Sequence, residues 1–404
     1  MQLSADMLAL AEEFGINPDS FPGLVVEADA LPAISAYLKE KRWHKAVLIM
    51  DAQTKAAAGE RLAGLLENES IQVHVIELLA NHHSQVNADE TSLVQVLVET
   101  PMDTDVLLAV GAGTIHDITR FCSQKLSIPF VAVPTAASVD GFTSKGAPLI
   151  LRGVKQTIQT AAPVAVFADL DVLCDAPRPL TAAGFGDILG KFTSLLDWEI
   201  SAMVGGEPYN TLAAKMTRRS LDSCIDHIED IAQGDQAGIK ILMQALIESG
   251  LVMQVLDFSR PASGAEHHLS HYWEMHLLEK DERQLLHGAK VGVACAIITE
   301  LYKSWAEQFD ALDAAGTISA ALRENWEEIR LKIAALPTAE ALRYYLYQVG
   351  APTSTEEIGI DDKLVQESLN EAYHLRDRCT GLFLINQFKE EQITFPLQDR
   401  IGKP

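Results

Sequence analysis

The feature that most constrains the fold is a regular alternation of apolar strand patterns and amphipathic helix patterns in the first 134 residues. Strand patterns occupy residues 21–27, 44–51, 71–78, 105–110 and 128–134. Helical patterns occupy residues 31–42, 54–68, 88–100 and 114–125. The strand segments are almost continuously apolar, which is typical of parallel strands buried on both faces. This order predicts a doubly wound α/β domain with a parallel, Rossmann-like sheet.

The alternation ends at the sequence CDAPRPL, where Pro177 and Pro179 interrupt it, after short strand patterns within 147–170. Helical spacing then recurs, almost without strand patterns, in residues 181–204, 208–231, 237–258, 264–278, 283–309, 316–334, 338–347 and 362–376. A chain of 404 residues is long for one compact core. We therefore expect an α/β domain over residues 1–178 and an all-α domain over residues 179–404.

The net charge of −24 limits the partners of this chain. Nucleic acids and anionic membranes bind clustered Lys and Arg, so neither is expected as a partner. The five cysteines are scattered without a CxxC pair, and no stretch reads as a signal peptide or a membrane span. We expect a reduced, cytoplasmic protein, in which an anionic small substrate would need a local cationic or metal site.

A stretch rich in histidine lies between Arg260 and Ala294 and holds five of the twelve histidines of the chain. His267 and His271 are four residues apart, which places both rings on one face of a helix. Two imidazoles from neighbouring helices and one carboxylate would form a catalytic metal site with open positions. The alternative is a polar, partly buried helix pair with ordinary histidines, which is the better interpretation of any one of them alone.

Two polar segments follow apolar strands in the first half. In AVGAGTIHDITR (109–120) a glycine turn opens a helix, whose free N–H groups and dipole favour a phosphate. The spacing is not GxGxxG, so a tight turn without a ligand fits equally well. In VPTAASVDGFTSKG (133–146) small polar residues crowd the presumed carboxyl edge of the sheet, where ligands of such sheets bind. A solvated loop with Asp140 as a turn residue is the alternative.

Two aspartates have equally open interpretations. Asp51 ends an apolar strand, where a carboxylate can bind the ribose hydroxyls of an adenine dinucleotide or cap the following helix. Asp187 is expected early in the first helix of the second half, where an acid often complements the helix dipole or pairs with Lys191 four residues on. A role for Asp187 as a metal ligand requires it to face His267 and His287.

Five ordered blocks together resemble the glycerol-1-phosphate dehydrogenases in their bacterial branch, within the dehydroquinate synthase-like and iron-dependent alcohol dehydrogenase superfamily. The resemblance covers most of the chain and is weak after about residue 310. The matching blocks are GAGTIHDITRF, VPTAASVDGFTS, GFGDILGKFTSLLDWE, SRPASGAEHHLSHYWE and LLHGAKVG. The acidic insert between His271 and His287 is similar to the bacterial branch rather than the archaeal one.

The resemblance implies a nucleotide-binding domain, a helical metal- and substrate-binding domain, and an active site in the cleft between them. It implies that Asp187, His267 and His287 ligate one divalent metal, zinc or nickel. The substrate would contact Asp140, Asp187 and His271, of which Asp187 and His271 are the candidate catalytic residues. With Asp51 added from its position, the expected residues for NAD(H), or NADP(H), are Asp51, Gly113, Thr114, Ile115, His116, Asp117, Thr135, Ala136, Ala137, Ser138 and Ser144.

The expected reaction is the reversible reduction of dihydroxyacetone phosphate, a small phosphorylated three-carbon substrate, to sn-glycerol 1-phosphate. The metal would act as a Lewis acid on the C2 oxygen, and His271 would position or relay a proton. Arg260, Lys145 and Lys191 are unranked candidates for the substrate phosphate. The alternatives are a glycerol or polyol dehydrogenase, a dehydroquinate synthase-like lyase, and a ligand-binding protein without turnover. A homo-oligomer, at least a dimer, is expected.

Overall fold

The first half of the chain folds into a six-stranded parallel sheet with the order β1-β8-β5-β4-β2-β3. The computed structural model describes residues 1–309 and 317–397. The strands of this sheet are β1 (Gly23–Glu27), β2 (Lys45–Met50), β3 (Gln72–Glu77), β4 (Val106–Gly111), β5 (Phe130–Pro134) and β8 (Ala165–Asp169). The predicted fold class, a parallel sheet followed by helices, is confirmed.

The sheet is covered on both faces, which explains its nearly continuous apolar strands. In β2, Val47 and Ile49 face one core, while Leu48 and Met50 face another. The second core is closed by α2 and α4, and the first by α5, α6 and the helical half. The helices of the first half are α1 (Ala5–Glu13), α2 (Leu31–Glu40), α3 (Ala52–Thr54), α4 (Glu60–Asn68), α5 (Glu90–Glu99), α6 (Gly113–Leu126) and α7 (Leu170–Cys174).

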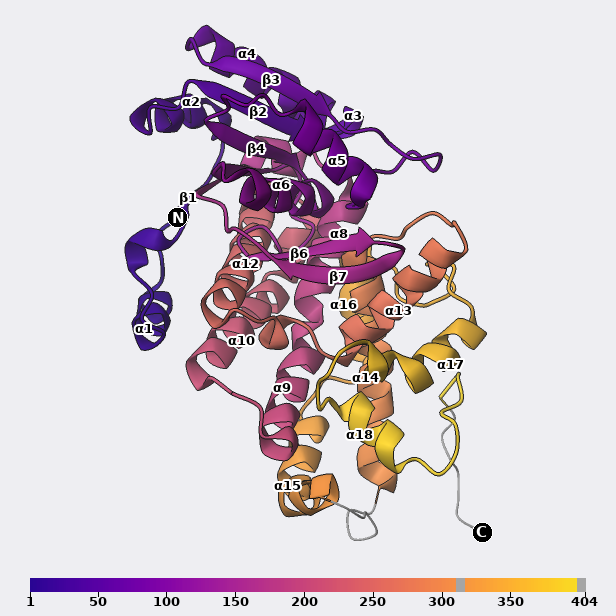
Figure 1. The fold of residues 1–404 in the computed structure, drawn as a ribbon. Coiled ribbons are helices and arrows are strands. Elements are labelled where there is room, and N and C mark those ends of the chain that lie inside the picture. The colour runs from indigo at the N-terminus through magenta and orange to yellow at the C-terminus, as the bar shows by residue number, and fades with distance from the viewer. Residues whose placement is uncertain (310–316, 398–404) are drawn as a thin grey trace.

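The described residues of the second half form helices joined by loops, without strands. Figure 1 shows these helices packed beneath the sheet. Its helices are α8 (Arg178–Leu189), α9 (Lys191–Gly205), α10 (Thr211–Asp226), α11 (Ile228–Gln233), α12 (Gln236–Leu256), α13 (Ala265–Glu279), α14 (His287–Gln308), α15 (Thr317–Ala334), α16 (Ala339–Gln348), α17 (Asp362–Glu371) and α18 (Gly381–Phe388). Because α1 and β1 also contact α12, the division into two domains at residue 178 stays a prediction.

The structure differs from the predicted elements in several places. The strand patterns within 147–170 contribute only β8 to the main sheet, because β6 (Gly146–Leu151) and β7 (Val154–Gln159) pair as an antiparallel hairpin. Figure 1 shows this hairpin between the sheet and α13. The single helix expected over 181–204 is two helices, α8 and α9, separated at Gly190. The single helix expected over 208–231 is likewise two helices, α10 and α11, separated at His227.

The helix α12 is long and apolar enough to cross a membrane by length and composition. Most of its apolar window is buried inside the protein, against α10, α11 and α8. Its composition is therefore accounted for by its place in the core.

Candidate active site

Three helices bring one carboxylate and two imidazoles together at one point. Asp187 lies on α8, His267 on α13, and His287 is the first residue of α14. One potential ligand atom from each lies within 4.8 Å of those of the other two. The Asp187 Oδ1 atom is 3.6 Å from Nε2 of His267 and 3.9 Å from Nε2 of His287. The facing arrangement that a shared ligand role requires is therefore present.

The expected position of Asp187 within its helix is wrong. It lies in the last turn of α8 rather than the first, because the helix begins at Arg178, with Pro179 in its opening turn, and already ends at Leu189. Proline is tolerated there, since its missing N–H would have no partner in the first turn. The negative end of the helix dipole therefore does not explain this carboxylate.

Close contact between α8 and α14 sets the distance from Asp187 to His287. A Cβ atom placed on Gly288 would lie 1.7 Å from the carbonyl oxygen of Ala183, and one on Gly186 would lie 2.3 Å from that of Gly288. Only glycine permits this approach of the two backbones. The glycines in the LLHGAKVG and GFGDILG blocks thus hold two candidate ligands in place.

Asp187 is suited to hold a cation. Its Oδ2 atom accepts a hydrogen bond from the backbone N–H of Asp140, at 2.9 Å. Its Oδ1 atom is buried and has no hydrogen-bond partner among the described residues, and it is the atom nearest the two imidazoles. Burial alone would raise the pKa of Asp187, but the charge of Lys191, with smaller contributions from His267 and His287, holds the pKa below its ordinary value. An ionised carboxylate oxygen without a partner fits a divalent cation.

Glu266 orients His267. The Nδ1–H group of His267 donates to Oε1 of Glu266, at 2.7 Å, which leaves Nε2 facing Asp187. Glu266 is fully buried and also accepts hydrogen bonds from the Gly264 N–H and the Thr193 hydroxyl. A carboxylate on the far nitrogen of a ligating histidine fixes its tautomer and strengthens it as a ligand.

His271 borders this cluster without belonging to it. Its ring centroid is 6.1 Å from that of His267 and 5.8 Å from that of His287. Burial, with the nearby charge of Lys155, lowers the pKa of His271 well below its ordinary value, so the ring is neutral. Its Nε2 atom accepts a hydrogen bond from the Arg376 guanidinium, at 3.2 Å. His271 is therefore placed to contact a ligand bound beside the cluster.

Burial likewise lowers the pKa of His287, to about 3, so this imidazole is in the neutral form that binds metals. At His267 the carboxylates of Asp187 and Glu266 outweigh the effect of burial and raise the pKa. A cation at the centre of the cluster would therefore displace a proton from His267, because a metal and a proton compete for the same lone pair.

Asp140 is tied into the same region by Lys191. The ammonium of Lys191 is 2.7 Å from Oδ2 of Asp140 and 3.7 Å from Oδ1 of Asp187. The hydroxyl of Ser249 donates to the same Asp140 oxygen, at 2.8 Å. The i,i+4 pair of Asp187 and Lys191 is therefore present, and Asp187 also faces the histidines, so its role as a metal ligand stays a prediction.

A cavity of about 350 Å³ connects these residues with the carboxyl edge of the sheet. The predicted site residues that line it are Gly113, Thr114, Asp117, Ser138, Asp140, Ser144, Asp187, His267, His271 and His287. The first turn of α6 opens onto it after Ala112, whose side chain makes no capping hydrogen bond. That uncapped helix start can receive a phosphate of a dinucleotide on its backbone N–H groups.

The other predicted cofactor residues do not line this cavity. Ile115 and His116 are buried under the helix, where Nδ1 of His116 donates to the Ala112 carbonyl. The predicted residues buried at the end of β5 are Thr135, Ala136 and Ala137. Asp51 caps α3, accepting from the Thr54 N–H at 2.8 Å, so the helix-cap alternative is present. Its role toward a ribose stays a prediction.

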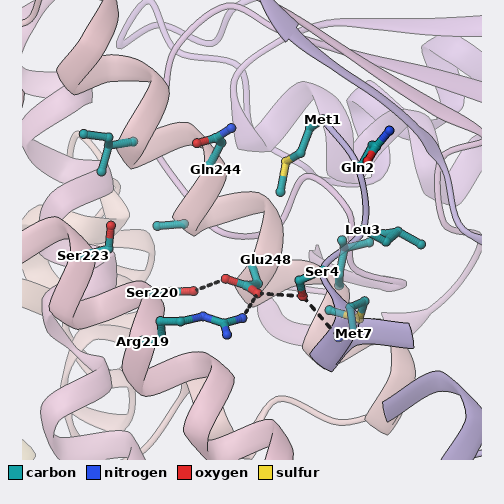
Figure 2. A pocket seen from close by; sticks show the side chains of 13 residues that line it. Met1, Gln2, Leu3, Ser4, Met7, Arg219, Ser220, Ser223, Gln244 and Glu248 are labelled. Carbon is teal, nitrogen blue, oxygen red and sulfur yellow. Dashed lines mark hydrogen bonds and ion pairs between the residues drawn. The ribbon is translucent and has the colours of Figure 1, made fainter. Parts of the chain in front are cut away.

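A second hollow lies between the N-terminal segment, α10 and α12 (Figure 2). Its carboxylate, Glu248, accepts hydrogen bonds from Arg219 and Ser220, each at 2.8 Å. Arg219 also pairs with Asp6. Because both carboxylates already pair with Arg219, this hollow is a less suitable site for a charged ligand than the histidine-lined cavity.

Several residues of the cavity wall were not identified from the sequence. Lys155 on β7 and Lys290 on α14 both pair with Glu274 of α13. Arg376 reaches His271 from the C-terminal segment. Glu266 does not line the cavity, and its contact with His267 could have been suspected from its place beside that residue. The contacts of the other residues join distant segments, for which no sequence motif was available.

The chain is similar to known dehydrogenases in sequence and in fold. Residues 25–177 match a family model described as iron-containing alcohol dehydrogenase. The glycerol-1-phosphate dehydrogenase (NAD(P)+) of Bacillus licheniformis is 51% identical over 357 residues, covering 88% of this chain and 86% of its own length. The glycerol-1-phosphate dehydrogenase (NAD(P)+) of Bacillus subtilis is 46% identical, and the match covers 96% of this chain and 97% of its own length. The structure of glycerol dehydrogenase from Schizosaccharomyces pombe superposes on this one with a TM-score of 0.65 at 19% sequence identity. The match covers 87% of this chain and 82% of that chain, which indicates a shared fold.

Proposed function

Because this chain belongs to the glycerol-1-phosphate dehydrogenase family, we propose that the histidine-lined cavity is its active site. The chain is an NAD(P)-dependent oxidoreductase that interconverts dihydroxyacetone phosphate and sn-glycerol 1-phosphate. The observation that carries the assignment to this cavity is the convergence of Asp187, His267 and His287, with ligand atoms within 4.8 Å of one another.

Asp187, His267 and His287 would hold the divalent metal, for which zinc or nickel suits a site of two imidazoles and one carboxylate. When bound, the metal supplies a Lewis acid that polarises the C2 oxygen of the substrate. Two features of the chain support this role. The Asp187 Oδ1 atom is buried without a hydrogen-bond partner in the described part of the chain, and Glu266 leaves Nε2 of His267 available.

The cofactor would lie along the carboxyl edge of the sheet. The uncapped first turn of α6, at Gly113 and Thr114, would receive its phosphates. Asp117, Ser138 and Ser144 border the same cavity between that turn and the metal ligands. These contacts would hold the nicotinamide against the substrate, so that the protein contributes alignment while the cofactor carries the hydride.

His271 and Asp140 would contact the substrate. The ring of His271 is neutral, and Arg376 donates to its Nε2 lone pair in this structure. Once the substrate displaces that contact, this lone pair could accept a proton from the C2 hydroxyl in oxidation and return it in reduction. Asp140 is held by Lys191 and Ser249, which fix its carboxylate beside Asp187. The chain's own groups thus orient the substrate and carry its proton.

A cytoplasmic location and a homodimer are also proposed. The five cysteines are free in the structure, as expected for a reduced compartment. A chain with a net charge of −24 is not suited to nucleic acid or to an anionic membrane.

The proposed function is tested by measuring NADH oxidation in the metal-loaded protein with dihydroxyacetone phosphate, with dihydroxyacetone, and without a ketone. We expect rapid oxidation only with the phosphorylated substrate, and its loss after treatment with a chelator. Faster turnover of dihydroxyacetone would instead indicate a polyol dehydrogenase. A rate that survives complete metal removal would exclude the metal's proposed role.

A further inference from the structure

A segment near the C-terminus places two arginines beside the metal-binding cluster. Arg376 and Arg378 lie between α17 and α18 and share two serines of the segment that leads into α13. Arg376 donates to the Ser263 hydroxyl at 3.2 Å, and Arg378 donates to the Ser259 hydroxyl at 3.0 Å and to the Ser263 carbonyl. This segment is therefore anchored to the wall of the active site.

Neither guanidinium has a carboxylate partner among the residues that the structure describes. The contacts of Arg376 are the two serine hydroxyls and Nε2 of His271, which are all uncharged groups. Burial lowers the pKa of Arg376. The pKa of Arg378 is lowered to about 9 by burial and by the neighbouring charges of Arg376 and Arg260. Two neighbouring cations held in this way are stabilised when an anion binds to them.

Of these two arginines, only Arg376 lines the cavity, together with His267, His271 and His287. Its Nη2 atom is 3.2 Å from Nε2 of His271, the ring that borders the metal-binding cluster. In dihydroxyacetone phosphate the phosphate is carried by C3, next to the C2 carbon whose oxygen would face the metal. A three-carbon substrate can therefore present its phosphate to the side of the cavity where Arg376 lies.

The cations suggested by the sequence are less suitable, because each already has a carboxylate nearby. Lys191 is buried between Asp140 and Asp187. Arg260 pairs with Glu207 and does not line the cavity. Lys145 lies 3.9 Å from a carboxylate oxygen of Asp257.

We infer that Arg376 binds the substrate phosphate and gives the enzyme its preference for the phosphorylated ketone. This inference rests on the proposed function. The planar guanidinium can donate two parallel hydrogen bonds to phosphate oxygens, which a lysine ammonium cannot. Arg376 therefore acts as a specificity residue, separate from the metal ligands.

The test compares Arg376→Met and Arg376→Lys with Arg343→Met in the metal-loaded enzyme. Arg343 pairs with Glu300 outside the cavity, so it controls for the loss of one charge. For Arg376→Met we expect kcat/KM with dihydroxyacetone phosphate to fall about 10–100-fold, as for a lost hydrogen bond to a charged group. The value with dihydroxyacetone should fall much less, because this ketone has no phosphate to bind, and the KM for NADH should stay near that of the wild type. Arg376→Lys should lie between Arg376→Met and the wild type.

Equal losses of kcat/KM with both ketones would show that Arg376 only positions His271. Wild-type values of kcat/KM with both ketones would show that Arg376 does not bind the phosphate. Either result overturns the inference. Thermal unfolding with inorganic phosphate gives a second readout that needs no turnover. With saturating NADH present to occupy the start of α6, we expect phosphate to raise the Tm of the wild type and of Arg343→Met, but not of Arg376→Met. If the wild type reduces no dihydroxyacetone phosphate, the proposed function fails, while the thermal shift still decides whether Arg376 binds phosphate.

Discussion

Replacing Gly288 by alanine should separate two metal ligands without touching either of them. The new Cβ atom would lie 1.7 Å from the carbonyl oxygen of Ala183. Ordinary contacts between such atoms are about 3.5 Å, so α8 and α14 must part by roughly 2 Å at this point. The adjacent His287 would then move away from Asp187, whose Oδ1 atom is now 3.9 Å from its Nε2 atom. Overpacking of this kind costs about 1–3 kcal/mol of stability.

A displacement of about 1 Å at a reacting centre can lower the rate on the order of 10²-fold, so we expect at least this loss in kcat/KM for Gly288→Ala. The matched control is Gly64→Ala on α4, where a Cβ atom would meet nothing within 4 Å. That variant should keep full activity and gain about 0.5–1 kcal/mol, since alanine favours a helix interior over glycine. Metal content, kcat/KM and Tm are measured for both. A Gly288→Ala enzyme with full metal occupancy and wild-type turnover would refute the argument that this contact sets the ligand geometry.

Three further predictions address the same site. His267→Ala and His287→Ala should give folded, metal-poor, inactive protein, whereas His271→Ala should keep its metal and lose turnover by about 10²–10⁴-fold. Metal content is measured beside activity for each variant. Metal loss in His271→Ala would show that His271 is a ligand. Glu266→Gln should weaken metal binding about 10–100-fold, measured by competition with a chelator, and unchanged affinity would remove its proposed role. The wild type should have a higher kcat/KM with NADH than with NADPH, and Asp51→Ala should reduce this difference. A wild type that prefers NADPH would contradict the proposed role of Asp51.

The alternation of strands and helices was sufficient to predict the sheet and the helical half. Strands buried on both faces, such as β2 and β4, carry a continuous apolar signal that few other structures produce. The β6–β7 hairpin was not distinguished from strands of the main sheet, because its pairing depends on contacts between segments rather than on periodicity. The position of Asp187 within its helix was not predictable from the helical spacing over 181–204, because α8 begins at Arg178 and ends at Leu189.

The candidate site was predictable where its residues stand in recognisable blocks. Asp187, His267 and His287 each lie in such a block, and the structure brings them together. Arg376 was not identified, because it lies more than 100 residues after His271 in a segment without a matching motif. Lys191 was a reasonable candidate for the phosphate until the structure showed that Asp140 and Asp187 already surround it.

The stereochemistry of the product tests the central claim most directly. Dihydroxyacetone phosphate is reduced by the metal-loaded enzyme with NADH, and the product is then offered, with NAD⁺, to a dehydrogenase specific for sn-glycerol 3-phosphate. The proposed function predicts that the product is formed in proportion to the NADH consumed and is left untouched by that second enzyme, which oxidises one enantiomer of a racemic standard. A product that the second enzyme oxidises completely would contradict the assignment of this chain as the source of sn-glycerol 1-phosphate.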